Sequence, residues 1–430
     1  MDHNKYTKFS LLPLLFFILI FIGSGIITQD FYQLPINVAL IATLVVAMVM
    51  FPKIKLSTKI HHAINGARDE NIILMVFIFL LAGAFGMITK ETGAVESTVN
   101  LGLTFIPSQL LLVGVFVIAC LISLTMGTST GTVVALGPIA LGIANGTEIS
   151  LPLSMATVVG GAMFGDNLSF ISDTTIVATK TQEVKMIDKF KVNFLIVLPG
   201  AVVTCIILFL LSMNIELDQS MDHPFNMINT IPYFIVLIFA LIGLNVLVVL
   251  TIGIVTAIVT GLITQSIQLN NIGSTLAEGI SSMQDIAIIA LLIGALLGLI
   301  QYYGGINWLL TTIKNKVRTV IGAKFGMGIL VSAINIATAN NTIALIIAGP
   351  LAKDIADTYT IDRRKSASII DIFASSTQGL LPYGAQILAA SGVASISPVM
   401  MLQYSYYPML LLICASCAII FNYPKLKSSN

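Results

Sequence analysis

Long apolar runs are the feature that most limits the folds open to this chain. Residues 9–27 and 35–51 form two such runs near the amino terminus. A helix that crosses a bilayer needs about 20 residues of this kind. Only 10% of the chain is charged, whereas soluble domains are about a quarter charged. The sequence therefore predicts an all-α, polytopic membrane protein, with further spans at residues 72–89, 193–213, 232–250, 253–267, 285–302 and 403–421.

The charged residues nearly cancel. Lysine and arginine number 21 and aspartate and glutamate 20, so the formal net charge of +1 offers no basic surface for nucleic acid. The four cysteines lie inside apolar runs, and the four histidines lie in the polar connections between them. This distribution argues against a disulfide framework and against a buried zinc or haem centre. We expect no nucleic-acid partner, no cofactor and no resident metal.

Several positions indicate an internal duplication. They recur at one offset of 212 residues, close to half the chain length. Many transporters consist of two related halves, and several matches at one offset favour the same organisation here. The matched positions are Gly86 with Gly298, Gly93 with Gly305, the Gly-Pro pair at 137–138 with that at 349–350, and the polar segment beginning at 165 with that beginning at 377.

The distribution of basic loops predicts that the two halves are inverted. Lysine and arginine gather at residues 53–68, 180–191, 314–324 and 353–365, and short basic loops mark the cytoplasmic side of a membrane protein. Moved by the repeat offset, each of these loops falls on a connection nearly free of basic residues. We therefore expect a cell-membrane protein with both termini in the cytoplasm and the acidic loop at residues 216–223 outside.

The remaining apolar stretches contain small and polar residues, as re-entrant hairpins and discontinuous helices do. Together the spans and stretches predict two inverted-topology repeats with about ten crossings plus two hairpins. The run at 9–27 is expected to stay as the first helix, because it is long and lacks a small-residue cleavage site. The interrupted stretches are residues 111–144, 154–182, 325–356 and 366–391.

The expected parts of the chain follow from these boundaries. An amino-terminal helix pair occupies residues 1–56 and repeat 1 occupies 57–215. Connecting helices occupy 216–270, and the inverted repeat 2 occupies 271–430. We expect the four parts to form one transport domain.

Two aspartates stand in the polar segment of residues 160–175, with apolar sequence on either side. A carboxylate in that setting must be neutralised by a proton or a cation, because an unpaired charge away from water is very unfavourable. An unwound turn between the aspartates would add carbonyl oxygens, which suit a small hard cation. The alternative roles are a helix cap or a partner for Lys180. The predicted ion- and proton-binding residues are Asp166, Asn167, Ser169, Ser172, Asp173 and Thr174.

Two further polar segments interrupt apolar runs at equivalent positions of the two halves. Residues 123–132 are rich in hydroxyls and glycine, which favours close helix packing, a transport pathway, or both. The paired asparagines of residues 335–342 are harder to explain by packing, because an amide can bind a cation, hold a helix end or bind a polar substrate. The predicted pathway residues are Thr128, Ser129, Thr130, Asn340, Asn341 and Thr342.

The fourth polar segment, residues 375–386, is the counterpart of the segment with the aspartates. It has Gln378 and Ala385 at the positions equivalent to the two aspartates, so the acidic site is expected in one half only. Pro382 and Gly384 predict a break in the helix. Asp371 is interpreted either as a snorkelling surface residue or as a second proton site. The predicted pathway residues here are Asp371, Ser375, Ser376, Thr377 and Gln378.

These segments resemble the NhaC-type sodium/proton antiporters, within the wider ion-transporter superfamily of inverted-repeat carriers. The resemblance rests on Met-Gly-Thr-Ser-Thr-Gly-Thr at 126–132 and on the run at 161–175 that ends in Ser-Asp-Thr-Thr. It covers the chain from about residue 60 onward, and the amino-terminal helix pair resembles an extra module of one branch of the family. The commoner family pattern has lysine and proline where this chain has Asn167 and Phe170.

The residues and the resemblance together predict a secondary active transporter and not an enzyme. Sodium and protons are the expected partners, competing for the membrane-embedded aspartates during alternating access, with the lipid bilayer as surroundings. The alternative is a sodium- or proton-coupled carrier of an amino acid or small carboxylate, because some relatives carry such solutes and the second half lacks acids. Whether the chain forms a homo-oligomer stays open.

Overall fold

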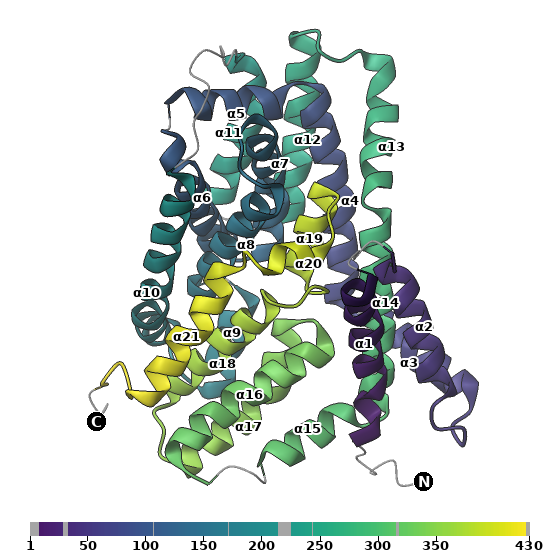
Figure 1. Cartoon of the computed structure of the whole chain (residues 1–430), viewed down its shortest axis with the longest axis vertical. Helices are drawn as coiled ribbons and strands as arrows, with labels where there is room; N and C mark the ends of the chain where they lie inside the picture. The colour runs from purple at the N-terminus through teal and green to yellow at the C-terminus, as the bar shows by residue number, and fades with distance from the viewer. Residues whose placement is uncertain are drawn as a thin grey trace.

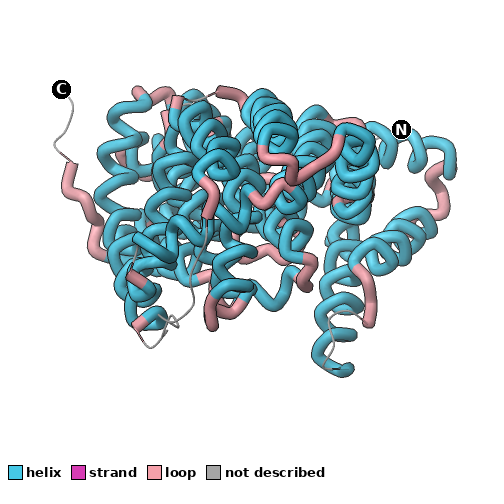
Figure 2. Tube along the Cα trace, turned by 90° about the horizontal axis from the view of Figure 1, so that it is seen from above, coloured by secondary structure: helices cyan, strands magenta, loops and turns pink. Residues whose placement is uncertain are grey.

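The structure, a computed structural model, describes residues 8–28, 33–105, 107–170, 172–213, 225–242, 244–314 and 318–426. Figure 2 shows helices and loops, and no strand, throughout this part of the chain. The predicted all-helical class is confirmed. The first half contains η1 (Lys8–Leu11), α1 (Leu12–Thr28), α2 (Ile36–Val49), α3 (Leu56–Ala67), α4 (Glu70–Glu91), α5 (Ala94–Phe105), η2 (Ser108–Leu110), α6 (Leu111–Met126), α7 (Ser129–Gly146), α8 (Leu151–Leu168), α9 (Asp173–Gln182) and α10 (Met186–Ser212).

The second half continues with the same kinds of element. Its helices are α11 (Met227–Leu241), α12 (Val246–Ile263), η3 (Leu269–Asn271), α13 (Ile272–Ser282), α14 (Gln284–Tyr302), α15 (Gly305–Lys314), α16 (Val320–Thr338), α17 (Asn341–Thr358), α18 (Arg363–Gln378), α19 (Ala385–Ala394), α20 (Pro398–Leu402) and α21 (Tyr406–Ile420).

Apolar helices of membrane-spanning length confirm a multi-pass membrane protein. Their outward faces are also apolar, as on α12, where Val255 and Val259 are 54% and 48% exposed, an arrangement suited to lipid contact. Five helical stretches of the described chain are long and apolar enough to cross a membrane, namely Ile72–Glu91, Met186–Ser212, Val246–Ile263, Leu269–Tyr302 and Val320–Thr338.

The predicted boundary between the spans at 232–250 and 253–267 was wrong. The structure ends α11 at Leu241 and begins α12 at Val246. The side chain of Asn245 caps α12 by accepting a hydrogen bond from the backbone N–H of Leu247 (2.9 Å). Gly253, the first residue of the second predicted span, lies inside α12, where an added Cβ would stand 2.6 Å from Val236 and 2.8 Å from Phe85. This glycine serves helix packing and does not end a helix.

The four interrupted stretches are pairs of helices separated by breaks, as predicted. The break between α6 and α7 is at Gly127, whose φ is 67°. The equivalent break between α16 and α17 is at Ala339, whose φ is 49°. A left-handed residue ends a helix because it turns the next residues away from the helix axis. The other two breaks separate α8 from α9 and α18 from α19.

The helix boundaries repeat with the 212-residue offset. Moved by that offset, α7 and α9 coincide with α17 and α19 at both ends. The correspondence also includes the amino-terminal pair, because α1 and α2 moved by the same offset overlap α11 and α12. The duplicated unit therefore extends over almost the whole described chain.

The two halves run in opposite directions. In Figure 1 the chain rises through α3 and α4 and descends through α13 and α14. Helix α4 packs on α13 and α3 packs on α14. Glycines allow these close contacts, because a Cβ on Gly83 would collide with the carbonyl oxygen of Gly279, and one on Gly66 with that of Gly294. The prediction of inverted repeats is confirmed.

Candidate functional site

A polar cavity of about 100 Å³ lies where the four helix breaks meet. The amino-terminal ends of α7, α9, α17 and α19 all contribute to its wall, together with apolar residues of α4. The cavity therefore combines equivalent segments of both repeats. It is lined by Leu74, Met75, Ile78, Gly127, Thr128, Ser129, Thr130, Asp166, Ser172, Asp173, Thr174, Ala339, Asn340, Asn341, Thr342, Gln378, Ala385 and Gln386.

Polar side chains cap two of the helices that start at the cavity. Thr128 accepts a hydrogen bond from the backbone N–H of Gly131 (3.3 Å) at the start of α7. At the equivalent position of α17, Asn340 accepts one from the N–H of Ile343 (3.0 Å). Both residues satisfy helix ends that would otherwise lack a partner. Two of the predicted pathway residues, Thr128 and Asn340, therefore stabilise the helix breaks.

Asp166 is the buried carboxylate of the cavity. It lies in the last turn of α8 and is 7% exposed. The hydroxyl of Ser129 donates to its Oδ2 atom (2.8 Å), and Ser172 is a second hydrogen-bonding side chain. Within the described residues no lysine or arginine forms an ion pair with Asp166. Hydrogen bonds alone offset its negative charge, so the site can take up a cation or a proton.

Asp173 lies on the same cavity but is exposed. It is the first residue of α9, where a carboxylate interacts favourably with the positive end of the helix dipole. The neighbouring hydroxyls of Ser172 and Thr174 lie 2.9 Å apart. The helix unwinds between the two aspartates as predicted, because α8 ends at Leu168 and α9 begins at Asp173. The two carboxylates therefore occupy different environments.

A second polar cluster lies beside the cavity and contains a buried ion pair. Lys189 of α10 and Asp371 of α18 form this pair, with side chains 1% and 0% exposed. Asn167 donates to Asp371 Oδ2 (3.0 Å), and its own carbonyl oxygen accepts from Lys189 Nζ (2.7 Å) and Asn193 (2.9 Å). Asp371 is thus an interior residue, and the snorkelling interpretation was wrong. Asn167 joins the two repeats and does not line the cavity.

The other predicted residues contact neighbouring helices. Ser375 accepts a hydrogen bond from Asn167 (3.1 Å). Ser376 donates to the carbonyl oxygen of Pro408 (2.7 Å), and Thr377 donates to Ser332 (2.7 Å). Ser169 ends α8 with its N–H on the carbonyl oxygen of Asp166 (3.2 Å). None of the four lines the cavity, so the structure divides the predicted set between the cavity and its supporting contacts.

Sequence reasoning missed two residues, Lys189 and Gln386. Lys189 was assigned to a basic loop, but it lies inside α10, one turn before Asn193. A lysine followed four residues later by an asparagine at the start of an apolar run places both on one helix face, which is the pattern that could have identified it. Gln386 ended a polar segment without any distinguishing pattern.

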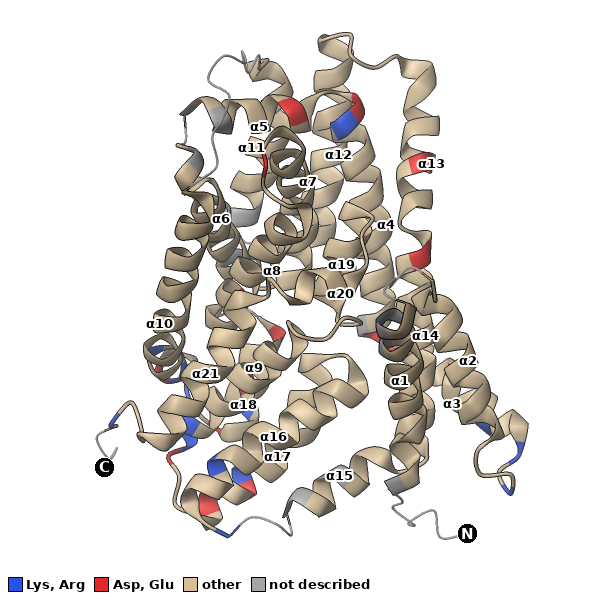
Figure 3. Cartoon of the chain, in the orientation of Figure 1, with Lys and Arg blue, Asp and Glu red and all other residues tan. Residues whose placement is uncertain are grey.

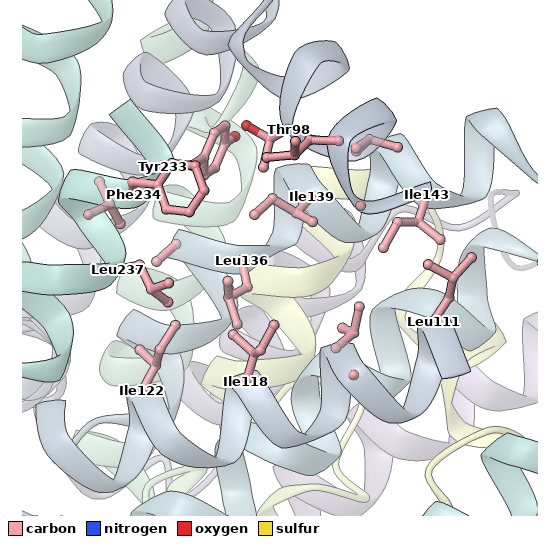
Figure 4. A pocket seen from close by; sticks show the side chains of 17 residues that line it. Thr98, Leu111, Ile118, Ile122, Leu136, Ile139, Ile143, Tyr233, Phe234 and Leu237 are labelled. Atoms are coloured by element: carbon pink, nitrogen blue, oxygen red, sulfur yellow. The ribbon is translucent and has the colours of Figure 1, made fainter. Parts of the chain in front are cut away.

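A larger cavity of about 400 Å³ lies between α5, α6, α7 and α11. Figure 4 shows that the side chains around it are mostly aliphatic, with Ile118, Leu136 and Leu237 among them. Its few oxygen atoms include those of Thr98 and Tyr233, and none of the described residues that line it is charged. This cavity lacks ligands for an ion, so the smaller polar cavity is the candidate site.

Known proteins resemble this chain over most of its length. The malate-2H(+)/Na(+)-lactate antiporter of Bacillus subtilis is 24% identical, over 96% of this chain and 95% of its own length. The Na(+)/H(+) antiporter NhaC of the same organism is also 24% identical, over 84% of this chain and 85% of its own. The arginine/ornithine antiporter ArcD of Halobacterium salinarum is 20% identical, over 77% of this chain and 76% of its own.

A solved structure and a family match complete the comparison. The YdaH transporter of Alcanivorax borkumensis is similar with a TM-score of 0.40 and 14% identity, covering 81% of this chain and 85% of that one. The Na+/H+ antiporter family matches residues 6–217 and 223–424, which include all four helix breaks around the polar cavity. The chain therefore belongs to the Na+/H+ antiporter family.

Proposed function

We propose that this protein exchanges sodium ions for protons across the cell membrane, with Asp166 as the group for which the two ions compete. The observation that carries the proposal is a buried carboxylate without a basic partner among the described residues, on a cavity formed by both repeats. An ionised carboxylate at this depth needs a cation, and a protonated one does not. Binding of one ion therefore excludes the other, which couples their movements.

The neighbouring oxygen atoms suit sodium, a hard cation. Ser172, Asp173 and Thr174 stand on the same cavity as Asp166 and add carboxylate and hydroxyl oxygens. In this proposal Asp173, which is exposed, receives the cation first, and Asp166 holds it inside the cavity. The opposed repeats then rock to expose the site to either side in turn.

The orientation in the membrane is part of the proposal. Figure 3 shows most lysine and arginine residues at the lower end of the view, on connections of both repeats. By the positive-inside rule that end faces the cytoplasm, which supports cytoplasmic termini. Residues 1–7 and 427–430, and the acidic loop at 216–223, lie outside the described residues.

The proposed parts remain residues 1–56, 57–215, 216–270 and 271–430. The overlap of α1 and α2 with α11 and α12 at the repeat offset supports grouping the first and third parts as equivalent helix pairs. Each pair then belongs to the repeat that follows it. A homo-oligomer is compatible with this arrangement.

A second candidate function is coupled transport of an amino acid or small carboxylate. It is favoured by the wall that repeat 2 contributes, where Asn340, Asn341 and Gln378 are neutral and α17 and α19 begin. Helix amino termini favour carboxylates. The relatives named for malate, lactate, arginine and ornithine support this candidate as well.

Purified protein in liposomes separates the two candidates. Sodium added outside should collapse an imposed proton gradient, and Asp166→Asn should abolish this exchange, because an amide cannot take up a proton in place of sodium. Asp173→Asn should weaken it less, because that residue is exposed. Accumulation of a labelled carboxylate or amino acid without sodium-driven proton release would favour the second candidate. Full exchange by Asp166→Asn would refute the role of that residue.

A further inference from the structure

We propose that Gln386, on the second repeat, is a ligand of the transported cation and binds it through its side-chain oxygen. Gln386 lies in the first turn of α19, is 3% exposed and lines the same cavity as Asp166. This inference rests on the proposed function, in which Asp166 holds the cation.

The orientation of the Gln386 amide follows from the hydrogens available around it. Its Nε2 atom lies 2.8 Å from the hydroxyl oxygen of Ser129, which in turn lies 2.8 Å from Oδ2 of Asp166. A hydroxyl has a single hydrogen, and an ionised carboxylate can only accept. Ser129 must therefore donate to Asp166 and accept from the amide nitrogen of Gln386. The amide oxygen is left facing away from Ser129.

Among the described residues that oxygen has no hydrogen-bond partner, although it is buried. An unpaired buried acceptor destabilises a protein, and a cation in the adjoining cavity would remove that penalty. Gln378 repeats the arrangement, because it lines the cavity, donates to the carbonyl oxygen of Ala339 (3.1 Å) and also leaves its oxygen unpartnered. Two neutral oxygens of repeat 2 thus accompany the carboxylate of repeat 1.

The arrangement makes the cation site a property of both repeats. Asp166 and Ser129 belong to the first repeat and Gln386 to the second, so a bound cation would join α8 to α19. Neutral amide oxygens are hard ligands that add no charge, so they suit a monovalent ion already balanced by one carboxylate. Gln386 is therefore expected to affect both the affinity for sodium and the preference between sodium and lithium.

The test is sodium binding to the purified full-length protein, measured by titration calorimetry at alkaline pH, with lithium as a second probe. Gln386→Met should weaken sodium binding about tenfold and change the lithium-to-sodium ratio, because one ligand oxygen is lost. Gln182→Met is the matched control. Gln182 is equally buried, but both ends of its amide are partnered, by the carbonyl oxygen of Gly349 (2.8 Å) and by Ser366 (2.7 Å). This control should keep the wild-type affinity and ratio.

Three further variants make the result decisive. The double variant Ser129→Ala/Gln386→Met should lose no more sodium-binding free energy than Ser129→Ala and Gln386→Met lose when their separate losses are added. The reason is that the two residues act in one hydrogen-bonded chain. Gln386→Glu keeps an oxygen for the cation but loses the donor to Ser129, so it should bind sodium more tightly than Gln386→Met. Gln386→Leu serves as the comparison if the methionine variant fails to fold. Wild-type affinity and ion preference in Gln386→Met, or binding by Gln386→Glu that is no tighter than that of Gln386→Met or Gln386→Leu, would overturn the inference. Undiminished binding by Asp166→Asn would instead refute the proposed function.

Discussion

The broken helices α8–α9 and α18–α19 share one backbone plan but differ in chemistry. Both second helices begin at equivalent residues, Asp173 and Ala385, and both first helices end near the polar cavity. Asp166 in the first repeat corresponds to Gln378 in the second. The duplicated backbone therefore supplies two sets of helix ends, whereas the carboxylates that line the polar cavity, Asp166 and Asp173, both come from the first repeat. The shape of the site comes from both repeats and its charge from one.

The packing of α6 against α8, and of α16 against α18, also shows one backbone arrangement with different side chains. In repeat 1, Gly161 of α8 packs against Phe116 of α6, and a Cβ on this glycine would collide with the Phe116 carbonyl oxygen. In repeat 2 the equivalent pair has the sizes exchanged, with Gly328 of α16 against the ring of Phe373 of α18. Each crossing needs one small residue, and either helix can provide it.

The largest effect is expected when the carboxylate is moved from the first repeat to the second. The double variant Asp166→Gln/Gln378→Asp should lose sodium/proton exchange in liposomes by at least about 100-fold. A carboxylate at 378 would face the carbonyl oxygen of Ala339, whereas Asp166 faces the hydroxyl donor of Ser129. Exchange well above that of Asp166→Gln alone would mean that the two breaks are chemically interchangeable.

The buried pair of Lys189 and Asp371 has no counterpart at the repeat offset, where Met401 and Val159 stand. Lys189→Met should lower the free energy of unfolding by about 3–5 kcal/mol, because it leaves Asp371 buried and unpaired. The double variant Lys189→Met/Asp371→Leu should recover much of this loss, since no charge then remains in the interior. Denaturation of the purified protein, monitored by circular dichroism, measures both. If the double variant is as unstable as Lys189→Met, the unpaired charge of Asp371 is not the cause of the lost stability.

Gly165 precedes Asp166, and its counterpart is Thr377. A Cβ on Gly165 would collide with the carbonyl oxygen of Cys120 and lie 2.6 Å from the Leu124 nitrogen. Gly165→Ala should therefore destabilise the protein by about 1–3 kcal/mol and displace Asp166. Gly114→Ala on α6 is the control, because no atom of the described residues lies within 4 Å of its added Cβ. Equal unfolding temperatures for the two variants would show that the α6–α8 crossing tolerates a wider separation.

The smallest effect is expected at Glu183, whose counterpart is Ser395; both end their helices with positive φ, 55° and 53°. Hydrogen bonds from Lys353 (2.5 Å) and Arg363 (2.6 Å) lower the pKa of Glu183. A lowered carboxylate pKa stabilises the fold at neutral pH, and this contribution disappears as pH falls below about 4.

Glu183→Gln should therefore lower the unfolding temperature slightly at pH 7, with the difference from wild type shrinking in acid, while sodium affinity stays unchanged. Differential scanning fluorimetry across pH checks this. If the difference in unfolding temperature between Glu183→Gln and the wild type grows in acid, the ionised carboxylate of Glu183 is not the cause of that difference.

Much of the fold was predictable because local rules and membrane constraints act along the chain. Glycine, proline and polar residues within apolar runs marked the four breaks, and the basic loops marked the inversion. The break between α11 and α12 was misplaced because the sequence is apolar on both sides of it; the structure places the break between Leu241 and Val246, and Gly253 packs against Phe85 and Val236. The correspondence of α1 and α2 with α11 and α12 at the 212-residue offset was not recognised in the sequence, because the two helix pairs share few distinctive residues.

The amino-acid sequence sufficed for the membrane class, the inverted duplication and the replacement of the two aspartates by Gln378 and Ala385 in the second half, since polarity and periodicity are properties of the chain. Which polar residues meet depends on the three-dimensional packing of the helices. Asn167 and Asp371 are 204 positions apart, and Ser129 and Gln386 are 257 apart. Such contacts depend on how two inverted halves pack against each other. That packing places Gln386 in the wall of the polar cavity and Lys189 in the polar cluster beside it, although neither stands out in the sequence.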